Sequence, residues 1–334
     1  MNPYILSIDA GTTGITIVVL DDKARICNKY YREFTQHYPK PGWVEHDGEE
    51  IWQVTYKLIQ SVFSDYKKQD CAGIGITNQR ETTIIWNRDT DKPIYHAIVW
   101  QCRRTQPICQ TLIDEGHETE FNKRTGLVID SYFSGTKIKW ILDNVDGARR
   151  KAERGDLAFG TIDSFLVWRL TEGRHHKTDA TNASRTMLFD INSHCWDSDL
   201  LKLLNIPKRI LPEVCDCVHE FGETSLFGGK INIGGIAGDQ QAALVGQCCF
   251  NLGEAKSTYG TGCFLILNTG EEKLTSSNNL LSTIAYRING KTTYGLEGSI
   301  FVAGSAVQWM RDGLKLFNSA SETEEISKKR HKKN

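Results

Sequence analysis

Short apolar runs with strand character alternate along this chain with longer segments whose apolar residues recur at helical spacing. An early segment, "GEEIWQVTYKLIQSVFSDY", places Ile51, Val54, Leu58 and Val62 on one helical face. The later segment "INIGGIAGDQQAALVGQ" predicts a strand, a turn and a helix, and two strand pairs follow residue 255. This order of elements predicts an α/β protein. A length of 334 residues is enough for two domains.

Composition excludes several classes of protein. The formal net charge is −1, which offers no electrostatic reason to expect a nucleic acid or a charged membrane as partner. Apolar runs such as "ITIVVL" are far shorter than the roughly 20 residues that span a bilayer, and no secretory signal is visible. The ten cysteines lie mostly in apolar or helix-like segments without any C-x-x-C pair. We therefore expect reduced thiols, a cytoplasmic location and no integral membrane segment.

The loop of the first hairpin, "DAGTTG", combines an acid with two glycines and two hydroxyls. Turn chemistry alone is one explanation, because tight turns favour Gly and Asp. The other is a phosphate-binding loop, in which Thr12, Thr13 and Gly14 offer donors while Asp9 meets a metal. The "GTG" loop at residues 260–262 again joins two apolar strands. Two such hairpins suggest a duplicated architecture around one ligand, with chance recurrence of turn residues as the alternative.

Charged and aromatic residues near strand ends also allow two interpretations. Asp239 stands between a strand and a helix, either as a helix N-cap or as a reactive carboxylate at a strand exit. Arg80 and Glu81 follow another strand, either as a surface ion pair or as a polar clamp for a small polyol. Trp100 and Tyr132 suit an apolar wall of a site or the core. The residues alone leave these alternatives open.

Nine stretches of the chain, read together, carry a family resemblance: "DAGTTG", "YPKPGWVEHD", "GITNQRETTIIW", "AIVWQCRRT", "TGLVIDSYFSGTK", "TNASRTM", "GIAGDQQAAL", "STYGTGCF" and "EGSIFVAGSAVQW". They resemble the FGGY family of carbohydrate kinases, whose members share the actin-like, ribonuclease-H-like ATPase fold. They follow the family order from residue 4 to about residue 317. "NQRETT" and "VWQCRRT" resemble the glycerol kinases more than the pentulose or hexulose kinases.

The resemblance implies an ATP-dependent kinase that phosphorylates glycerol to sn-glycerol 3-phosphate. Asp239 would be the general base and would share a Mg²⁺ ion with Asp9. The implied glycerol-binding residues are Arg80, Glu81, Trp100, Tyr132, Asp239 and Gln240. The implied nucleotide-binding residues are Thr12, Thr13, Gly14, Thr261, Gly304 and Gln308. A homo-oligomer is also implied.

The resemblance also predicts how the chain is divided. We expect a complete N-terminal kinase domain over residues 1–245 and a partial C-terminal kinase domain over residues 246–317. Residues 318–334 would form a polar, disordered tail. Thr16 stands where glycerol kinases typically have a basic residue that contacts the nucleotide. Because the family's chain continues beyond this point, a second hypothesis is a catalytically impaired or inactive shortened protein that binds a polyol or a protein partner.

Overall fold

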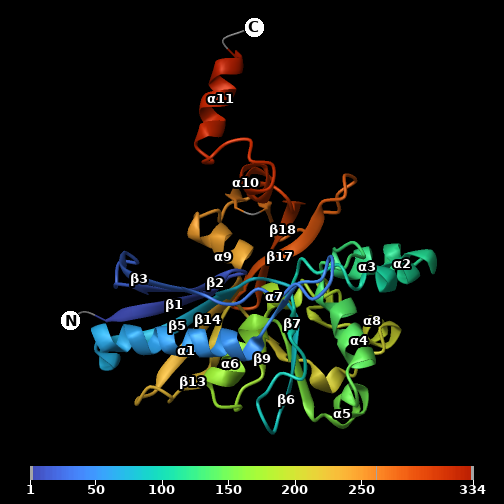
Figure 1. Ribbon diagram of the computed structural model, residues 1–334. Helices are drawn as coiled ribbons and strands as arrows, with labels where there is room; N and C mark the ends of the chain where they lie inside the picture. The colour runs from blue at the N-terminus through green and yellow to red at the C-terminus, as the bar shows by residue number, and fades with distance from the viewer. Residues whose placement is uncertain (1–2, 261, 332–334) are drawn as a thin grey trace.

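Two β-sheets organise the chain, of which this computed structural model describes residues 3–260 and 262–331 (Figure 1). The first sheet has six strands in the order β13-β14-β5-β1-β2-β3. Their bounds are Tyr4–Ala10 (β1), Gly14–Leu20 (β2), Ile26–Glu33 (β3), Cys71–Asn78 (β5), Val218–Thr224 (β13) and Ile231–Gly238 (β14). Strands β1, β5 and β14 run parallel to one another. Their carboxyl ends therefore meet at one edge, where α/β proteins place their sites.

Helices α1 (Gly48–Asp65) and α6 (Ile162–Leu170) contribute to the hydrophobic core of this sheet. The predicted face of α1 is buried, including Ile51 and Val62, and Asp47 caps the helix by accepting a hydrogen bond from the Glu49 N–H. A second core lies among short strands and helices. The elements that contribute to it are β6 (Ile84–Asn87), β7 (Ala97–Ile98), α2 (Gln106–Asp114), α3 (Glu118–Thr125), α4 (Ser134–Asn144), α5 (Ala148–Arg154), β8 (Leu157–Gly160) and α8 (Ser198–Leu203). Strand β4 (Glu45–His46) pairs with β7.

Smaller elements complete the first part of the chain. Strand β9 (Lys177–Asp179) pairs with β12 (Glu213–Cys215), and β10 (Phe189–Asp190) pairs with β11 (Cys195–Trp196). Helix α7 (Ala180–Ala183) follows β9, and single 3₁₀ turns occupy Lys68–Asp70 and Lys208–Ile210.

The second sheet is antiparallel, with four strands in the order β15-β16-β18-β17. Their bounds are Ala255–Tyr259 (β15), Cys263–Gly270 (β16), Leu281–Ile288 (β17) and Lys291–Ile300 (β18). Both hairpins predicted after residue 255 are present. Asn289 and Gly290 turn the second one with positive φ angles of 52° and 73°, as a tight two-residue hairpin turn requires. Helix α9 (Asp239–Gly246) packs Leu244 onto this sheet, so it connects the two sheets.

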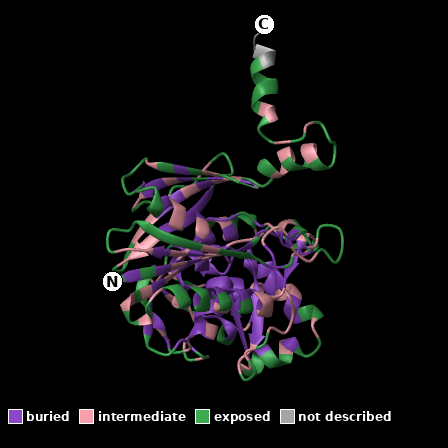
Figure 2. Ribbon diagram, turned by 60° about the vertical axis from the view of Figure 1, so that its left-hand side comes forward, coloured by how far each residue is buried: buried purple, intermediate pink, exposed green. Residues whose placement is uncertain are grey.

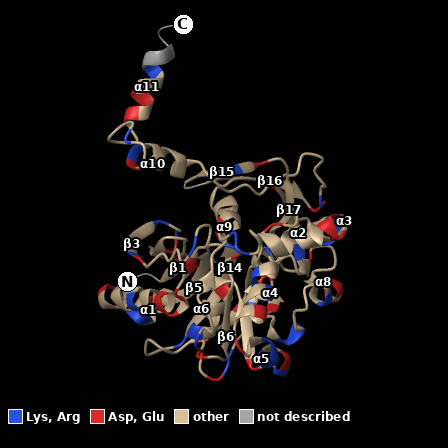
Figure 3. Cartoon of the chain, turned by 45° about the vertical axis from the view of Figure 1, so that its right-hand side comes forward, with Lys and Arg blue, Asp and Glu red and all other residues tan. Residues whose placement is uncertain are grey.

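The end of the described chain differs from the prediction. The apolar spacing of Val302, Ala306, Leu314 and Phe317 predicts a helix over residues 300–317. The helix found there, α10 (Gly304–Asp312), is shorter, and none of its residues is buried. Figure 2 shows this helix and α11 standing away from the main body. The prediction of a disordered tail is corrected for Glu322–His331, which form α11. Its acidic first turn (Figure 3) and the Glu324–Lys328 ion pair suit the helix dipole and the i,i+4 spacing.

Two expectations from composition can be compared with the structure. All ten cysteines are free in the structure. Within residues 3–260 and 262–331, no helix is long and apolar enough to cross a membrane.

Candidate active site

The ends of three parallel strands bring the predicted site residues together. In the sheet register Asp9 pairs with Thr77, and Asn78 pairs with both Ala10 and Gly238. The loops that leave β1, β5 and β14 therefore start side by side, carrying Asp9, Arg80 with Glu81, and Asp239. This convergence is a property of the parallel sheet, since these segments are far apart along the chain.

The first predicted phosphate loop is the turn between β1 and β2. Its backbone is closed by a hydrogen bond from the Gly11 N–H to the Gly14 carbonyl, 3.0 Å long. The Thr12 hydroxyl accepts a hydrogen bond from the Trp100 indole N–H at 2.9 Å. Thr13 is exposed. The turn is thus hydrogen-bonded to Trp100, which is predicted to bind the substrate.

Gly14 packs directly against strand β3. A Cβ atom here would be 2.6 Å from the Arg32 carbonyl oxygen and 2.8 Å from the Tyr31 ring. We expect Gly14→Ala to lower the free energy of unfolding by about 1–3 kcal/mol, because backbone must move to make room. Urea unfolding checks this. Gly75→Ala in β5, whose Cβ would be 3.9 Å from its nearest neighbour, is the matched control, and an equal loss in both variants would contradict the prediction.

A strained turn after β5 presents Arg80 and Glu81. Glu81 has a φ angle of +59°, a left-handed conformation that is costly for a residue with a Cβ. The turn is held by a hydrogen bond from the Thr82 N–H to the Arg80 carbonyl, 2.7 Å long. Both charged side chains are almost completely buried. The surface ion pair is therefore excluded.

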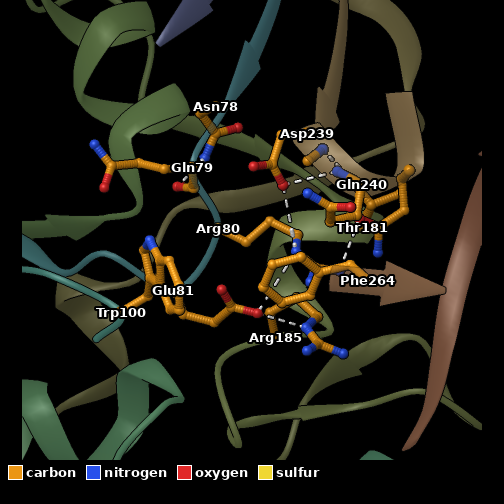
Figure 4. Close-up of polar contacts among 12 residues, drawn as sticks. Asn78, Gln79, Arg80, Glu81, Trp100, Thr181, Arg185, Asp239, Gln240 and Phe264 are labelled. Atoms are coloured by element: carbon orange, nitrogen blue, oxygen red, sulfur yellow. Dashed lines mark hydrogen bonds and ion pairs between the residues drawn. The ribbon is translucent and has the colours of Figure 1, made fainter. Parts of the chain in front are cut away.

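Four buried charged side chains meet at the pocket: Arg80, Arg185, Glu81 and Glu297. Figure 4 shows the first three of them. Arg80 makes a bidentate pair with Glu297, with Nη1–Oε2 and Nη2–Oε1 distances of 2.5 and 2.9 Å. Arg185 donates to Glu81 at 2.7 Å and to Glu297 at 2.9 Å. Burial raises the pKa of Glu297, but the charges of Arg185 and Arg80 lower it to about 2.

Asp239 is the first residue of α9, and Gly238 is the N-cap. The carboxylate accepts a hydrogen bond from the Gln240 N–H at 2.7 Å, and its Oδ1 lies 3.5 Å from Arg80 Nε. The side chain is about one-third exposed, so it has access to a ligand. Burial raises the pKa of Asp239, Arg80 lowers it, and the nearby charge of Asp9 raises it further. The interpretation of Asp239 as a helix N-cap is wrong, because Gly238 occupies that position.

A pocket of about 160 Å³ opens at this point. Its lining residues are Thr12, Arg80, Glu81, Trp100, Asp239, Gln240, Thr258, Gly260, Gly262 and Phe264. Five predicted glycerol-binding residues and one predicted nucleotide-binding residue thus face a single cavity. Tyr132 lies behind it, where its hydroxyl accepts a hydrogen bond from Arg80 Nη2 at 3.1 Å. Tyr132 instead lines a neighbouring apolar pocket of about 330 Å³ with Trp100 and Phe301.

The other predicted nucleotide-binding residues are only partly placed. Thr261 lies outside the described residues, although its neighbours Gly260 and Gly262 line the pocket. Gly304 donates its N–H to the Gly260 carbonyl at 3.0 Å, which joins α10 to this loop. Neither Gly304 nor Gln308 lines the pocket, and both are exposed.

The carboxylates of Asp9 and Asp239 fit a divalent cation. Burial raises the pKa of each, and the charge of Asp9 also raises the pKa of Asp239. Two nearby carboxylates that repel one another are stabilised by a shared cation, and Mg²⁺ prefers such oxygen ligands. These two residues are the ones predicted to hold the metal.

Some residues of the site were missed in the sequence. They are Arg185, Gln241, Lys256, Phe264 and Glu297. Lys256 donates a hydrogen bond to the side-chain oxygen of Gln240 and another to Thr258. Glu297 and Arg185 each carried a usable signal: a lone charge within a run of uncharged residues, "TTYGLEGSI" and "TNASRTM". Such a charge is costly to bury without a partner.

Comparison with known proteins places both parts of the chain in one family of kinases. The model of the FGGY family of carbohydrate kinases, N-terminal domain, matches residues 4–246, and that of the C-terminal domain matches residues 255–333. The second match thus includes most of residues 318–334, the segment predicted as a polar tail. "Glycerol kinase 2" of Thermotoga maritima is 56% identical over 98% of this chain and 66% of its own length, and the glycerol kinase of Marinomonas sp. is 57% identical over 98% and 67%.

Solved structures extend the comparison. Plasmodium falciparum glycerol kinase with ADP has a TM-score of 0.92 and 39% identity, over 98% of this chain and 67% of that one. A xylulose kinase from Lactobacillus acidophilus, at 20% identity and a TM-score of 0.86, covers 98% and 66% and shares the fold. The chain spans about two thirds of the length of the relatives it matches. With its actin-like α/β fold, a complete N-terminal domain and a partial C-terminal domain, it belongs to the FGGY family of carbohydrate kinases.

Proposed function

We propose that this chain transfers the γ-phosphate of ATP to a terminal hydroxyl of glycerol, giving sn-glycerol 3-phosphate. The observation that carries the proposal is the pocket of about 160 Å³, in which a half-buried carboxylate, Asp239, lies beside the charged pair Arg80 and Glu81. The 56% identity to "Glycerol kinase 2" of Thermotoga maritima supports glycerol as the acceptor. The Plasmodium falciparum glycerol kinase was solved with ADP, which supports a nucleotide as the donor.

The charged groups of the pocket each have a chemical role in this reaction. Asp239 takes the proton from the hydroxyl that attacks phosphorus. Arg80 Nε, which has no hydrogen-bond partner within the described residues, donates to a glycerol oxygen, while Glu81 accepts from a hydroxyl. Trp100 and Phe264 cover the carbon side. Mg²⁺, when held by Asp9 and Asp239, offsets negative charge on the transferring group.

The phosphate side of the proposed site lies on the two Gly/Thr turns. The turn at Thr12, Thr13 and Gly14 and the loop around Thr261 offer backbone and hydroxyl donors to phosphate oxygens, with Gly304 and Gln308 toward the nucleotide. The Trp100–Thr12 hydrogen bond connects this side to the acceptor pocket. A homo-oligomer stays a prediction from the resemblance, and a cytoplasmic location stays a prediction from the placement of the cysteines.

Transfer of labelled γ-phosphate from ATP to glycerol by the purified chain tests the proposal. We expect propane-1,3-diol to have a kcat/KM at least about 100-fold lower than that of glycerol, because the missing hydroxyl leaves a buried polar group of the clamp unpaired. The same assay with D-xylulose tests the acceptor class. Equal rates with the diol, or a preference for D-xylulose, would contradict glycerol as the acceptor.

A second function, polyol binding without transfer, is favoured by the positions of Gly304 and Gln308 on an exposed helix outside the pocket. Calorimetric titration with glycerol separates the two functions. Binding together with product supports the kinase, whereas binding by folded protein that forms no product supports the binding protein. Absence of binding contradicts both.

A further inference from the structure

Glu297 is the one member of the buried charge cluster that comes from the second sheet. It lies on β18, paired in register with Leu281 of β17 and Ile266 of β16, so strands flank it on both sides. Its side chain is fully buried. Arg80 and Arg185, its ion-pair partners, belong to the first part of the chain. This carboxylate therefore reaches Arg80 of the acceptor site from the second sheet. Figure 1 shows where β18 lies.

The contacts of Arg80 determine which edge of its guanidinium faces the pocket. Both Nη atoms bind Glu297, and in addition Nη1 donates to Gln241 Oε1 and Nη2 donates to the Tyr132 hydroxyl, each at 3.1 Å. Only the Nε edge is left, 3.5 Å from Asp239 and 3.7 Å from Glu81. Nε is a fully buried donor without a hydrogen-bond partner in the described part of the chain. A ligand oxygen would satisfy it.

The same contacts keep Arg80 from forming a close bidentate ion pair with Asp239. Arg80 is closer to Glu297, at 2.5 and 2.9 Å, than to Asp239 at 3.5 Å. Without the Glu297 carboxylate, the guanidinium would have Asp239 and Glu81 as its remaining anionic partners near the pocket. A bidentate pair with either of them would turn the guanidinium into the space that a ligand needs.

We propose that Glu297 is a positioning residue, which holds Arg80 in the orientation that binds a polyol hydroxyl and leaves Asp239 free. The proposal rests on the function proposed above and adds a dependence that the pocket residues alone do not reveal. Because Glu297 belongs to the second sheet, docking of that sheet completes the polyol clamp. By linkage, a bound polyol then stabilises the docked arrangement.

Calorimetric titration of glycerol into the whole chain tests this without requiring catalysis. For Glu297→Gln we expect the glycerol dissociation constant to rise on the order of tenfold or more, since one charge-assisted contact to the ligand is misplaced. Glu297→Asp keeps the charge and is expected to recover part of the affinity. If Glu297→Gln does not fold, Glu297→Asp tests the proposal in its place. Its glycerol affinity must then lie measurably below that of the unchanged chain.

Asp216→Asn is the matched control. Asp216 also pairs across the two parts of the chain, with Arg287 of β17 at 2.5 Å, but it does not contact Arg80. We expect its glycerol affinity to stay within about twofold of that of the unchanged chain. Unaltered affinity in both Glu297 variants, or an equal loss in Asp216→Asn, would overturn the positioning role. Absence of glycerol binding by the unchanged chain would instead overturn the proposed function.

Discussion

Asp239→Asn is expected to lower the rate of phosphate transfer to glycerol by roughly 10²–10⁴-fold, the contribution typical of a positioned general base. The amide has the shape of the carboxylate and still accepts the hydrogen bond from the Gln240 N–H, but it cannot take a proton. Glycerol binding should change much less, because Arg80 and Glu81 remain. Single-turnover transfer of labelled phosphate measures the rate, and calorimetry measures the binding.

The control for this variant is Asp199→Asn. Asp199 also lies in the first turn of a short helix, α8, but it is exposed and outside the pocket, so the transfer rate should not change. The pH profile gives a second readout: the acid-side fall in the transfer rate that comes from protonation of the Asp239 carboxylate should be absent in Asp239→Asn. A full rate in Asp239→Asn would mean that another group accepts the proton.

Arg80→Met is expected to lower the free energy of unfolding by about 3–5 kcal/mol, the loss typical when one partner of a buried ion pair is removed. The hydrophobic replacement fills much of the space, yet Glu297 loses its bidentate partner and keeps Arg185 and the Ser299 hydroxyl. Glu81 also loses a nearby positive charge. Urea unfolding followed by circular dichroism measures the change.

Two further variants separate the effect on stability of removing a buried charge from that of removing an exposed one. Arg154 pairs with Asp156 at the surface, so Arg154→Met should cost at most about 1 kcal/mol. The double variant Arg80→Met with Glu297→Leu removes both partners, and we expect it to recover part of the stability lost in Arg80→Met. A loss in Arg80→Met as small as that of the surface variant would show that the cluster tolerates an unpaired charge.

Many elements could be predicted from local sequence. The helical spacing of Ile51, Val54, Leu58 and Val62 matches the buried face of α1, and the Asn289–Gly290 turn has the conformation that its residues favour. These features depend on neighbours a few positions away, where propensity and periodicity apply. Helix α10 was predicted too long, because its apolar spacing continues past Asp312 while no described element buries it.

The candidate site was predictable in part. The loops that carry Asp9, Asp239 and the Arg80–Glu81 pair were identified from their place at strand ends. Whether Arg80 and Glu81 were a surface pair or a buried clamp could not be decided, since adjacent charges have the same local pattern in either environment. Tyr132 was predicted to contact the ligand, but the structure places it behind Arg80.

By itself the sequence determined which residues are available: acids and glycines at strand ends, hydroxyls in two turns, and alternation that allows an α/β fold. Only the tertiary structure decided that Arg80 points its Nε edge into a pocket. The partner responsible, Glu297, lies 217 positions away on another sheet. Local patterns do not encode which distant carboxylate will share a buried site, because that pairing is set by how the two sheets pack and by the cost of burying a charge alone.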